Sequence, residues 1–194
     1  MAVVAAETLS PRKRCDRMRA VGAEARLQEL GIELPGLLPA VGNYLPAKRH
    51  RDLVFVSGHG PLKLDAIGTS GGRVDGFLAM EDALPALIQG KVGDQVSLDE
   101  AREAARATGL FLLASLRAEI GSLDRVASIL KVFGMVNCAP GFNQMAAVID
   151  GCSDLLVDVF GESVGRHARS AVGMAELPLD IPLEIEMVAA VQAD

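Results

Sequence analysis

Two side chains near the carboxyl end of the chain have the types and spacing for acid recognition and hydrolysis. Arg169 lies within residues 166–173, and Glu184 lies within residues 183–186. An arginine presents a planar fork that binds a carboxylate through two hydrogen bonds, which lysine cannot reproduce. A carboxylate that is not engaged by this arginine could orient a water molecule for attack. The pair could therefore bind a small keto or imino acid and hydrolyse it, although a structural salt bridge between Arg169 and Glu184 fits the same pattern.

The elements around these two side chains are predicted to be strands. Residues 167–174 form one predicted strand, and residues 183–191 form the last one. Because side chains alternate along a strand, Glu184 and Glu186 share one face and the apolar positions between them share the other. We expect the two strands to be neighbours in a sheet, which would bring Arg169 close to both glutamates.

Two helices and a further strand precede them in the chain. A helix is predicted from Ser97 to Gly121, because Ser97 and Glu100 form a capping-box motif at its start and glycine is typical of a helix end. Residues 126–136 are rich in β-branched and aromatic side chains, which predicts a strand. Apolar residues at helical spacing over residues 145–160 predict the second helix.

The order of these elements predicts the fold class. An apolar run at residues 53–56 adds an earlier strand, whereas residues 65–90 are poorly patterned and are interpreted as an irregular excursion with one helical turn near residues 80–88. Strands, helix, strand, helix and strands in this order predict an α+β sheet with two long helices on one face. The other face carries small apolar residues beside its carboxylates, so we expect a partner subunit to cover it.

Composition limits the classes of function. The chain has 194 residues, of which 50% are hydrophobic, and this is enough for one core in one domain. A formal net charge of −6 argues against a nucleic-acid partner, because phosphate binding needs concentrated lysine and arginine. No apolar stretch is long enough to span a membrane. Cys15, Cys138 and Cys152 form no close pair and no histidine has metal-ligand spacing, so we expect no structural disulfide, no metal site and a cytoplasmic location.

Five short motifs, in order along the chain, carry a family resemblance. They are residues 41–44 (VGNY), 54–61 (VFVSGHGP), 89–92 (QGKV), 168–170 (ARS) followed by Leu177 and Pro178, and 183–186 (LEIE). Together they resemble the YjgF/RidA family of reactive intermediate deaminases. The resemblance begins at about residue 41, so we predict an N-terminal extension over residues 1–40 and a YjgF/RidA-like domain over residues 41–194.

The resemblance implies both a fold and an activity. YjgF/RidA proteins are trimers with a chorismate-mutase-like fold. Their active members hydrolyse reactive enamines and imines, such as 2-aminoacrylate and 2-iminopropanoate, to a 2-keto acid and ammonia, and they need no cofactor. The resemblance therefore predicts a homotrimeric deaminase whose partner is a small 2-imino or 2-keto acid. The alternative is a non-catalytic binding or regulatory protein for a small keto or imino acid.

The resemblance also assigns the residues of the site. Arg169 falls on the family's carboxylate-binding arginine, Glu184 falls on its water-positioning glutamate, and Tyr44 falls on its pocket tyrosine. His59 stands where the family usually has glutamine, and either a pocket-lining role or a plain loop role fits it. The predicted lining of the substrate site is completed by Ser57, Gly58, His59, Ala171 and Phe133.

Overall fold

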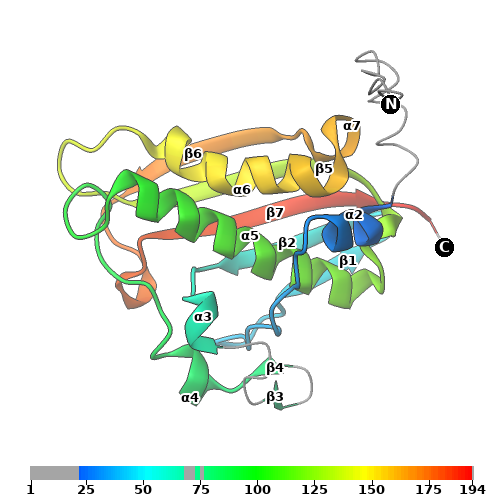
Figure 1. Cartoon of the computed structure of the whole chain (residues 1–194), viewed down its shortest axis with the longest axis horizontal. Coiled ribbons are helices and arrows are strands. Elements are labelled where there is room, and N and C mark those ends of the chain that lie inside the picture. Colours follow the sequence, from blue (N-terminus) through cyan, green and yellow to red (C-terminus); the bar gives the residue numbers. More distant parts are fainter. Residues whose placement is uncertain (1–21, 68–72, 75–76, 194) are drawn as a thin grey trace, which may run out of the picture.

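A five-stranded sheet forms the centre of the computed structural model, which describes residues 22–67, 73–74 and 77–193. The helices α5 (Leu98–Ile120) and α6 (Met145–Phe160) lie side by side across one face of this sheet (Figure 1). The predicted α+β sheet with two long helices on one face is therefore confirmed. The order of the strands is β1 (Ala47–His50), β2 (Leu53–His59), β7 (Leu183–Val191), β5 (Val126–Asn137) and β6 (Ala168–Met174).

The longer helix, α5, begins and ends where the sequence predicts. Ser97 Oγ accepts a hydrogen bond from the backbone N–H of Glu100 at 3.3 Å, and the Glu100 carboxylate accepts one from the backbone N–H of Ser97 at 2.9 Å. This capping box satisfies backbone donors that the helix itself leaves free. Gly121 follows the helix at a φ of 83°, a left-handed value that glycine adopts without strain. Neither α5 nor any other helix in the described part of the chain is long and apolar enough to cross a membrane.

The unit formed by β5, α6 and β6 sets the order of the last strands. Because α6 carries the chain back along the sheet, β6 runs parallel to β5 and pairs with it. After η2 (Pro178–Asp180), the chain enters β7, which pairs antiparallel with the opposite edge of β5. The strand β5 therefore separates β6 from β7, and the prediction that the last two strands are neighbours is wrong.

Alternation along β7 decides which side chains face the helices. Leu183, Ile185 and Met187 are buried in the main core beneath α5 and α6. Glu184 and Glu186 point to the opposite face, away from α5 and α6. The sequence therefore predicts both faces of this strand correctly.

The edge strand β1 is missed by the sequence analysis because it has no apolar pattern. It is a strand through its pairing with β2, in which Ala47 lies opposite Val56 and His50 lies opposite Leu53. Its middle residues are basic, and charged side chains are common on edge strands, where they discourage pairing with other chains.

A short helix, α2 (Ala23–Glu29), lies within the predicted N-terminal extension and packs on the main core. Leu27 is buried there. The Glu24 carboxylate accepts a hydrogen bond at 2.9 Å from the first backbone N–H of η1 (Leu123–Arg125), the turn that leads into β5. In the described part of that extension, the chain therefore adds to the same core as the sheet.

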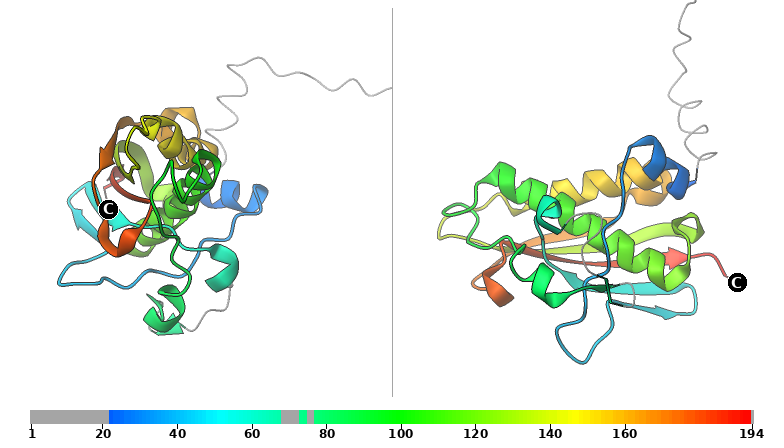
Figure 2. Two further views of the ribbon diagram at one scale, coloured as in Figure 1. Left: turned by 90° about the vertical axis from the view of Figure 1, so that its left-hand side faces the viewer. Right: turned by 60° about the horizontal axis from the view of Figure 1, so that its bottom comes forward.

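The excursion between β2 and α5 contains short elements around a small core of its own. It comprises α3 (Leu64–Ile67), β3 (Arg73–Val74), β4 (Phe77–Leu78) and α4 (Met80–Ala83), the last being the helical turn that the sequence predicts near residue 80. Figure 2 shows α3 and α4 standing away from the two main layers. The small core joins the excursion to α5 and is made by Leu62, Leu78, Ala83, Ala86 and Phe111.

Candidate functional site

Glu184 lines a cavity of about 370 Å³ that lies between the sheet and the excursion. Three further residues predicted for the site, Tyr44, Gly58 and His59, line the same cavity. The remaining lining is mostly apolar and comes from the segment before β1, the excursion and the turn before β7. The structure therefore brings together half of the predicted site around the predicted water-positioning glutamate.

The Glu184 carboxylate is held at the cavity wall in a state that suits a base. Burial raises the pKa of Glu184 above its usual range, and the nearby charge of Glu186 raises it further. The carboxylate makes no hydrogen bond or ion pair within the described residues. A Cβ atom at position 58 would overlap Glu184 Oε1, so Gly58 leaves the space that this carboxylate occupies. Such a group is free to accept a proton from a molecule in the cavity.

His59 is a fixed, neutral part of the wall. Its Nδ1 lies 2.7 Å from the carbonyl oxygen of Ser57, and its Nε2 lies 2.8 Å from Ser115 Oγ on α5. Because a carbonyl can only accept, Nδ1 carries the proton and Nε2 accepts the hydrogen bond of the serine hydroxyl. Burial lowers the pKa of His59. Of the two roles left open by the sequence, pocket lining is the one the structure supports.

Ser57 and Phe133 do not line the cavity that Glu184 lines. Ser57 Oγ donates a hydrogen bond to the carbonyl oxygen of Leu45 at 2.7 Å. Both residues line a second hollow of about 210 Å³ on the sheet face opposite α5 and α6, together with Phe55 and Val188. Within one subunit, these two predicted site residues are therefore not part of the cavity at Glu184.

Arg169 lies on the opposite face of the sheet from Glu184. In the strand register, Arg169 and Met187 both pair with Val132, which places the arginine on the helix side. Arg169 Nη1 donates to Asp150 Oδ1 at 2.7 Å and to Ser153 Oγ at 3.0 Å, both on α6. The alternative of a salt bridge between Arg169 and Glu184 is thus wrong within one subunit.

Ala171 follows Arg169 on the same face and packs against the main core. The side chain of Arg169 is 23% exposed, and its Nε and Nη2 atoms make no hydrogen bond within the described residues. One side of the guanidinium fork is therefore held by α6, and the other side remains available for a ligand carboxylate.

Ser153 and His167 lie beside Arg169, and the sequence does not predict Ser153 as a site residue. Ser153 Oγ lies 3.1 Å from His167 Nε2, and His167 Nδ1 donates to the carbonyl oxygen of Gly165 at 2.7 Å. Burial lowers the pKa of His167, and the charge of Arg169 lowers it further. Ser153 follows Asp150 by three residues and therefore lies on the same face of α6. This spacing is the signal that could have identified Ser153.

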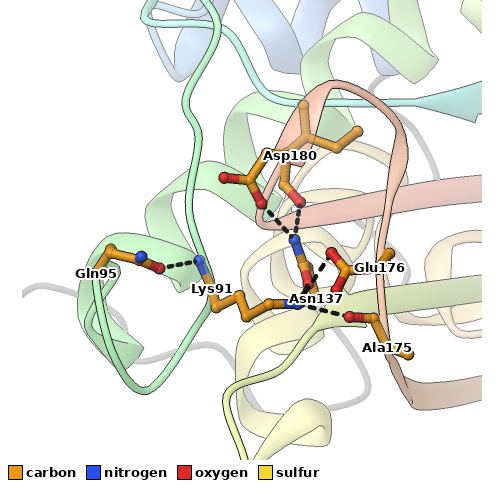
Figure 3. Close-up of polar contacts among 7 residues, drawn as sticks. Lys91, Gln95, Asn137, Ala175, Glu176 and Asp180 are labelled. Carbon is orange, nitrogen blue, oxygen red and sulfur yellow. Dashed lines mark hydrogen bonds and ion pairs between the residues drawn. The ribbon is translucent and has the colours of Figure 1, made fainter.

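A polar cluster at the end of β5 fixes the turn that leads into β7 (Figure 3). Lys91 Nζ donates to Asn137 Oδ1 at 2.7 Å and to the carbonyl oxygen of Ala175 at 2.6 Å. It also lies 3.2 Å from the Glu176 carboxylate. Asn137 is fully buried, and its Nδ2 donates to Asp180 Oδ1 at 3.1 Å. The cluster therefore ties the segment before α5 to the turn before Glu184.

The turn needs this support because its backbone is strained. Leu179 and Asp180 have φ values of 58° and 56°, in the left-handed region that residues other than glycine rarely adopt. The backbone N–H of Gly90 donates to the carbonyl oxygen of Asp180 at 2.7 Å, and the Gln89 side chain donates to that of Leu179 at 2.8 Å. Since Leu179 lines the cavity at Glu184, residues 89–91 position one of the cavity walls.

The described cysteines are both free thiols. Cys152 is fully buried on α6, and burial raises its pKa to about 12. Cys138 is partly buried at the end of β5. No disulfide joins these two, as the sequence predicts, and Cys15 lies outside the described residues.

The fold and the cavity together define a chorismate-mutase-like α+β protein. A family model described as "YjgF/chorismate_mutase-like, putative endoribonuclease" matches residues 75–190. The chain belongs to this YjgF family, as the motifs predict.

The chain is also similar to individual proteins of other organisms. Protein TCP17 of Trypanosoma cruzi is 36% identical over 162 residues, which are 84% of this chain and 89% of that protein. The crystal structure of a protein of unknown function from Agrobacterium tumefaciens is 33% identical, with a TM-score of 0.67, and the match covers 93% of this chain and 99% of the other. A "putative endoribonuclease" from Shewanella oneidensis is 28% identical with a TM-score of 0.72, over 88% of this chain and 99% of the other.

Proposed function

We propose that the protein hydrolyses reactive enamines and imines of the 2-aminoacrylate and 2-iminopropanoate type to a 2-keto acid and ammonia. One observation carries the proposal: Glu184, a carboxylate with a raised pKa and no partner within the described residues, lines a largely apolar cavity. A carboxylate in that state is suited to accept a proton from a water molecule near neutral pH. Family membership and the match of Arg169 and Glu184 to the family's motif support the same reaction.

The proposed active form is a homotrimer in which Arg169 and Glu184 come from different subunits. These two side chains point to opposite faces of one sheet, so a single subunit cannot hold one small molecule between them. Arg169 lies on β6, which is an edge strand, and an edge can approach the cavity of a neighbour. The uncovered sheet face carries apolar side chains, including the exposed Phe55, and a closed ring would cover them.

In the proposed reaction, Arg169 holds the substrate carboxylate and Glu184 handles the protons. The free side of the arginine fork binds the carboxylate through two hydrogen bonds. A water oxygen bonds to C2 of the imine while one water proton passes to Glu184 and the C=N electron pair moves to nitrogen. Glu184 then returns this proton to nitrogen and also transfers the hydroxyl proton to nitrogen, so that the C2–N bond breaks, ammonia leaves and the keto group forms. An enamine enters the same path after it gains a proton at C3 and loses one from nitrogen, which converts it into the imine tautomer.

The net charge of the chain disfavours an RNA substrate for this cavity. The formal charge is −6, and the cavity itself presents a carboxylate and apolar side chains rather than lysine and arginine. Binding to a phosphate backbone depends on such cations.

A coupled assay tests the proposal. A dehydratase generates 2-aminoacrylate in solution, and the release of 2-keto acid and ammonia is followed with and without the protein. We expect the protein to accelerate the release, and Glu184→Gln to remove the acceleration. If the wild-type protein leaves the rate at its uncatalysed value while still binding the keto acid, it is a binding protein and not a deaminase.

A further inference from the structure

The cavity at Glu184 has the lining of a side-chain pocket. Beyond the site residues, its wall includes the apolar side chains of Leu38, Leu62, Met80, Ala83, Leu84 and Leu87. Besides Glu184, the ionisable side chains of the lining are the exposed Tyr44 and His59, and His59 has both ring nitrogens occupied and offers no free donor or acceptor. Most of the cavity wall can therefore contact only an apolar group, with Glu184 at one side.

The cavity is much larger than a small imino acid needs. Its volume is about 370 Å³, more than twice the roughly 150 Å³ at which an apolar cavity already binds benzene. The side chain of 2-iminopropanoate is a single methyl group. Such a substrate would leave most of this apolar wall in contact with water or with empty space.

The extra wall comes from the irregular excursion, which is anchored firmly enough to act as a pocket. Ala83 and Leu62 belong to the small core that packs on Phe111 of α5. The backbone N–H of Leu78 donates to the carbonyl oxygen of Leu37 at 2.7 Å, which joins the excursion to the segment before β1. The excursion is therefore hydrogen-bonded to the segment before β1 and packs on α5.

The rim of the cavity also exposes large apolar side chains. Val41, Met80, Leu84 and Leu179 are all exposed, and all four line the cavity. Exposed apolar groups gathered at one hollow mark a binding site more often than scattered ones do. An apolar substrate group entering beside Glu184 would cover them.

We infer that the substrate carries a large apolar side chain, and that residues 38–41 and 80–87 form the pocket that selects it. This inference rests on the proposed function, since the substrate's C2 atom must lie at Glu184. It assigns the 2-imino and 2-keto acids derived from leucine-like, methionine-like or phenylalanine-like amino acids as the substrate class.

The test compares two imines that differ only in side chain. An amino-acid oxidase produces the imines of leucine and alanine in solution, and semicarbazide traps the imine that escapes hydrolysis. We expect the wild-type kcat/KM to favour the leucine-derived imine on the order of 50-fold, because it buries three more carbon atoms. Equal rates, or a preference for the alanine-derived imine, would overturn the inference.

Leu84→Gln places a polar group of similar length in the pocket, and Leu30→Gln is the matched control. Both leucines are exposed, and Leu30 lies outside the cavity. We expect Leu84→Gln to reduce the preference about tenfold and Leu30→Gln to leave it unchanged. If Leu84→Gln changes the mass of the oligomer in light scattering and leaves the preference intact, the patch is a subunit interface and the inference is wrong.

Calorimetry separates this inference from the proposed function. If neither imine is hydrolysed faster than without protein, the deaminase proposal fails, and binding of the 2-keto acids decides the pocket's role. Tighter binding of 4-methyl-2-oxopentanoate than of pyruvate by the wild type, lost in Leu84→Gln, would sustain the apolar pocket. Equal affinities would refute it.

Discussion

Lys91→Met should destabilise the protein by removing the centre of the polar cluster before β7. Methionine keeps much of the length of the lysine stem but lacks the ammonium group that bonds Asn137 and Ala175 at 2.7 and 2.6 Å. Hydrogen bonds to a charged group are worth about 1.5–3 kcal/mol each, and Asn137 is buried, so its oxygen would lose its donor without access to water. We expect a loss on the order of 2–4 kcal/mol in the free energy of unfolding.

The ion pair with Glu176 contributes little to this figure. The Glu176 side chain is 78% exposed, and exposed pairs contribute about 0–1 kcal/mol. Glu176→Gln should therefore stay close to the wild type. Lys63→Met is the matched control, because Lys63 is exposed and its side chain makes no bond within the described residues.

Thermal unfolding at one fixed protein concentration measures these differences. For a chain of this size, the expected loss lowers the Tm of Lys91→Met by about 5–15 °C. A Lys91→Met protein that melts within about 2 °C of the wild type would refute the reasoning. So would a Glu176→Gln protein that loses as much stability as Lys91→Met, because the exposed ion pair would then carry the effect.

Three predictions concern the site. Arg169→Lys should weaken ligand binding by about 2–5 kcal/mol, which is a loss of about 30- to 4,000-fold in affinity, because the lysine ammonium contacts the ligand carboxylate at one point and the guanidinium contacts it at two. Calorimetry measures this loss, and the exposed Arg166→Lys is the control. Glu184→Gln keeps the shape of the side chain but cannot accept a proton, so keto-acid binding should persist while turnover falls on the order of 100-fold or more; a parallel loss of binding would contradict the assigned role. The raised pKa of Glu184 predicts that kcat/KM falls as the pH drops through a value above that of an ordinary glutamate, because protonation removes the base; an unchanged acid limb in Glu184→Gln would assign that limb to another group.

The local parts of the fold can be predicted because their signals are local. Ser97 and Glu100 satisfy each other's backbone groups within one turn, so the start of α5 follows from the sequence alone. Alternation in β7 likewise assigns Glu184 to the face away from the core, since the period of a strand does not depend on its neighbours.

The relation between Arg169 and Glu184 cannot be predicted in the same way, because it depends on strand order. Alternation along a strand determines the face on which each side chain lies, but it does not determine which strand is the neighbour. A strand, a helix and a second strand in succession favour a parallel neighbour, and this rule would have placed β6 against β5. The contact between Arg169 and Asp150 on α6 then follows, because Arg169 lies on the face of β6 that the helices cover.

Long-range packing explains the other features that the sequence does not predict. The role of His59 depends on Ser115, which is 56 residues away in the chain and meets it only after α5 packs on the sheet. The excursion shows little hydrophobic periodicity of its own because its small core is completed by Phe111 of α5. Neither contact leaves a periodic signal in the sequence.

In the proposed trimer, one active site is shared between two subunits, with Arg169 from one and Glu184 from the next. Mixing subunits tests it directly: Arg169→Lys and Glu184→Gln chains, each inactive alone, are coexpressed with different tags, and mixed trimers are purified through both tags. One of the three interfaces in each such trimer joins an intact Arg169 to an intact Glu184, so we expect activity to return at about a third of the wild-type rate. Mixed trimers that form and remain inactive would contradict the claim.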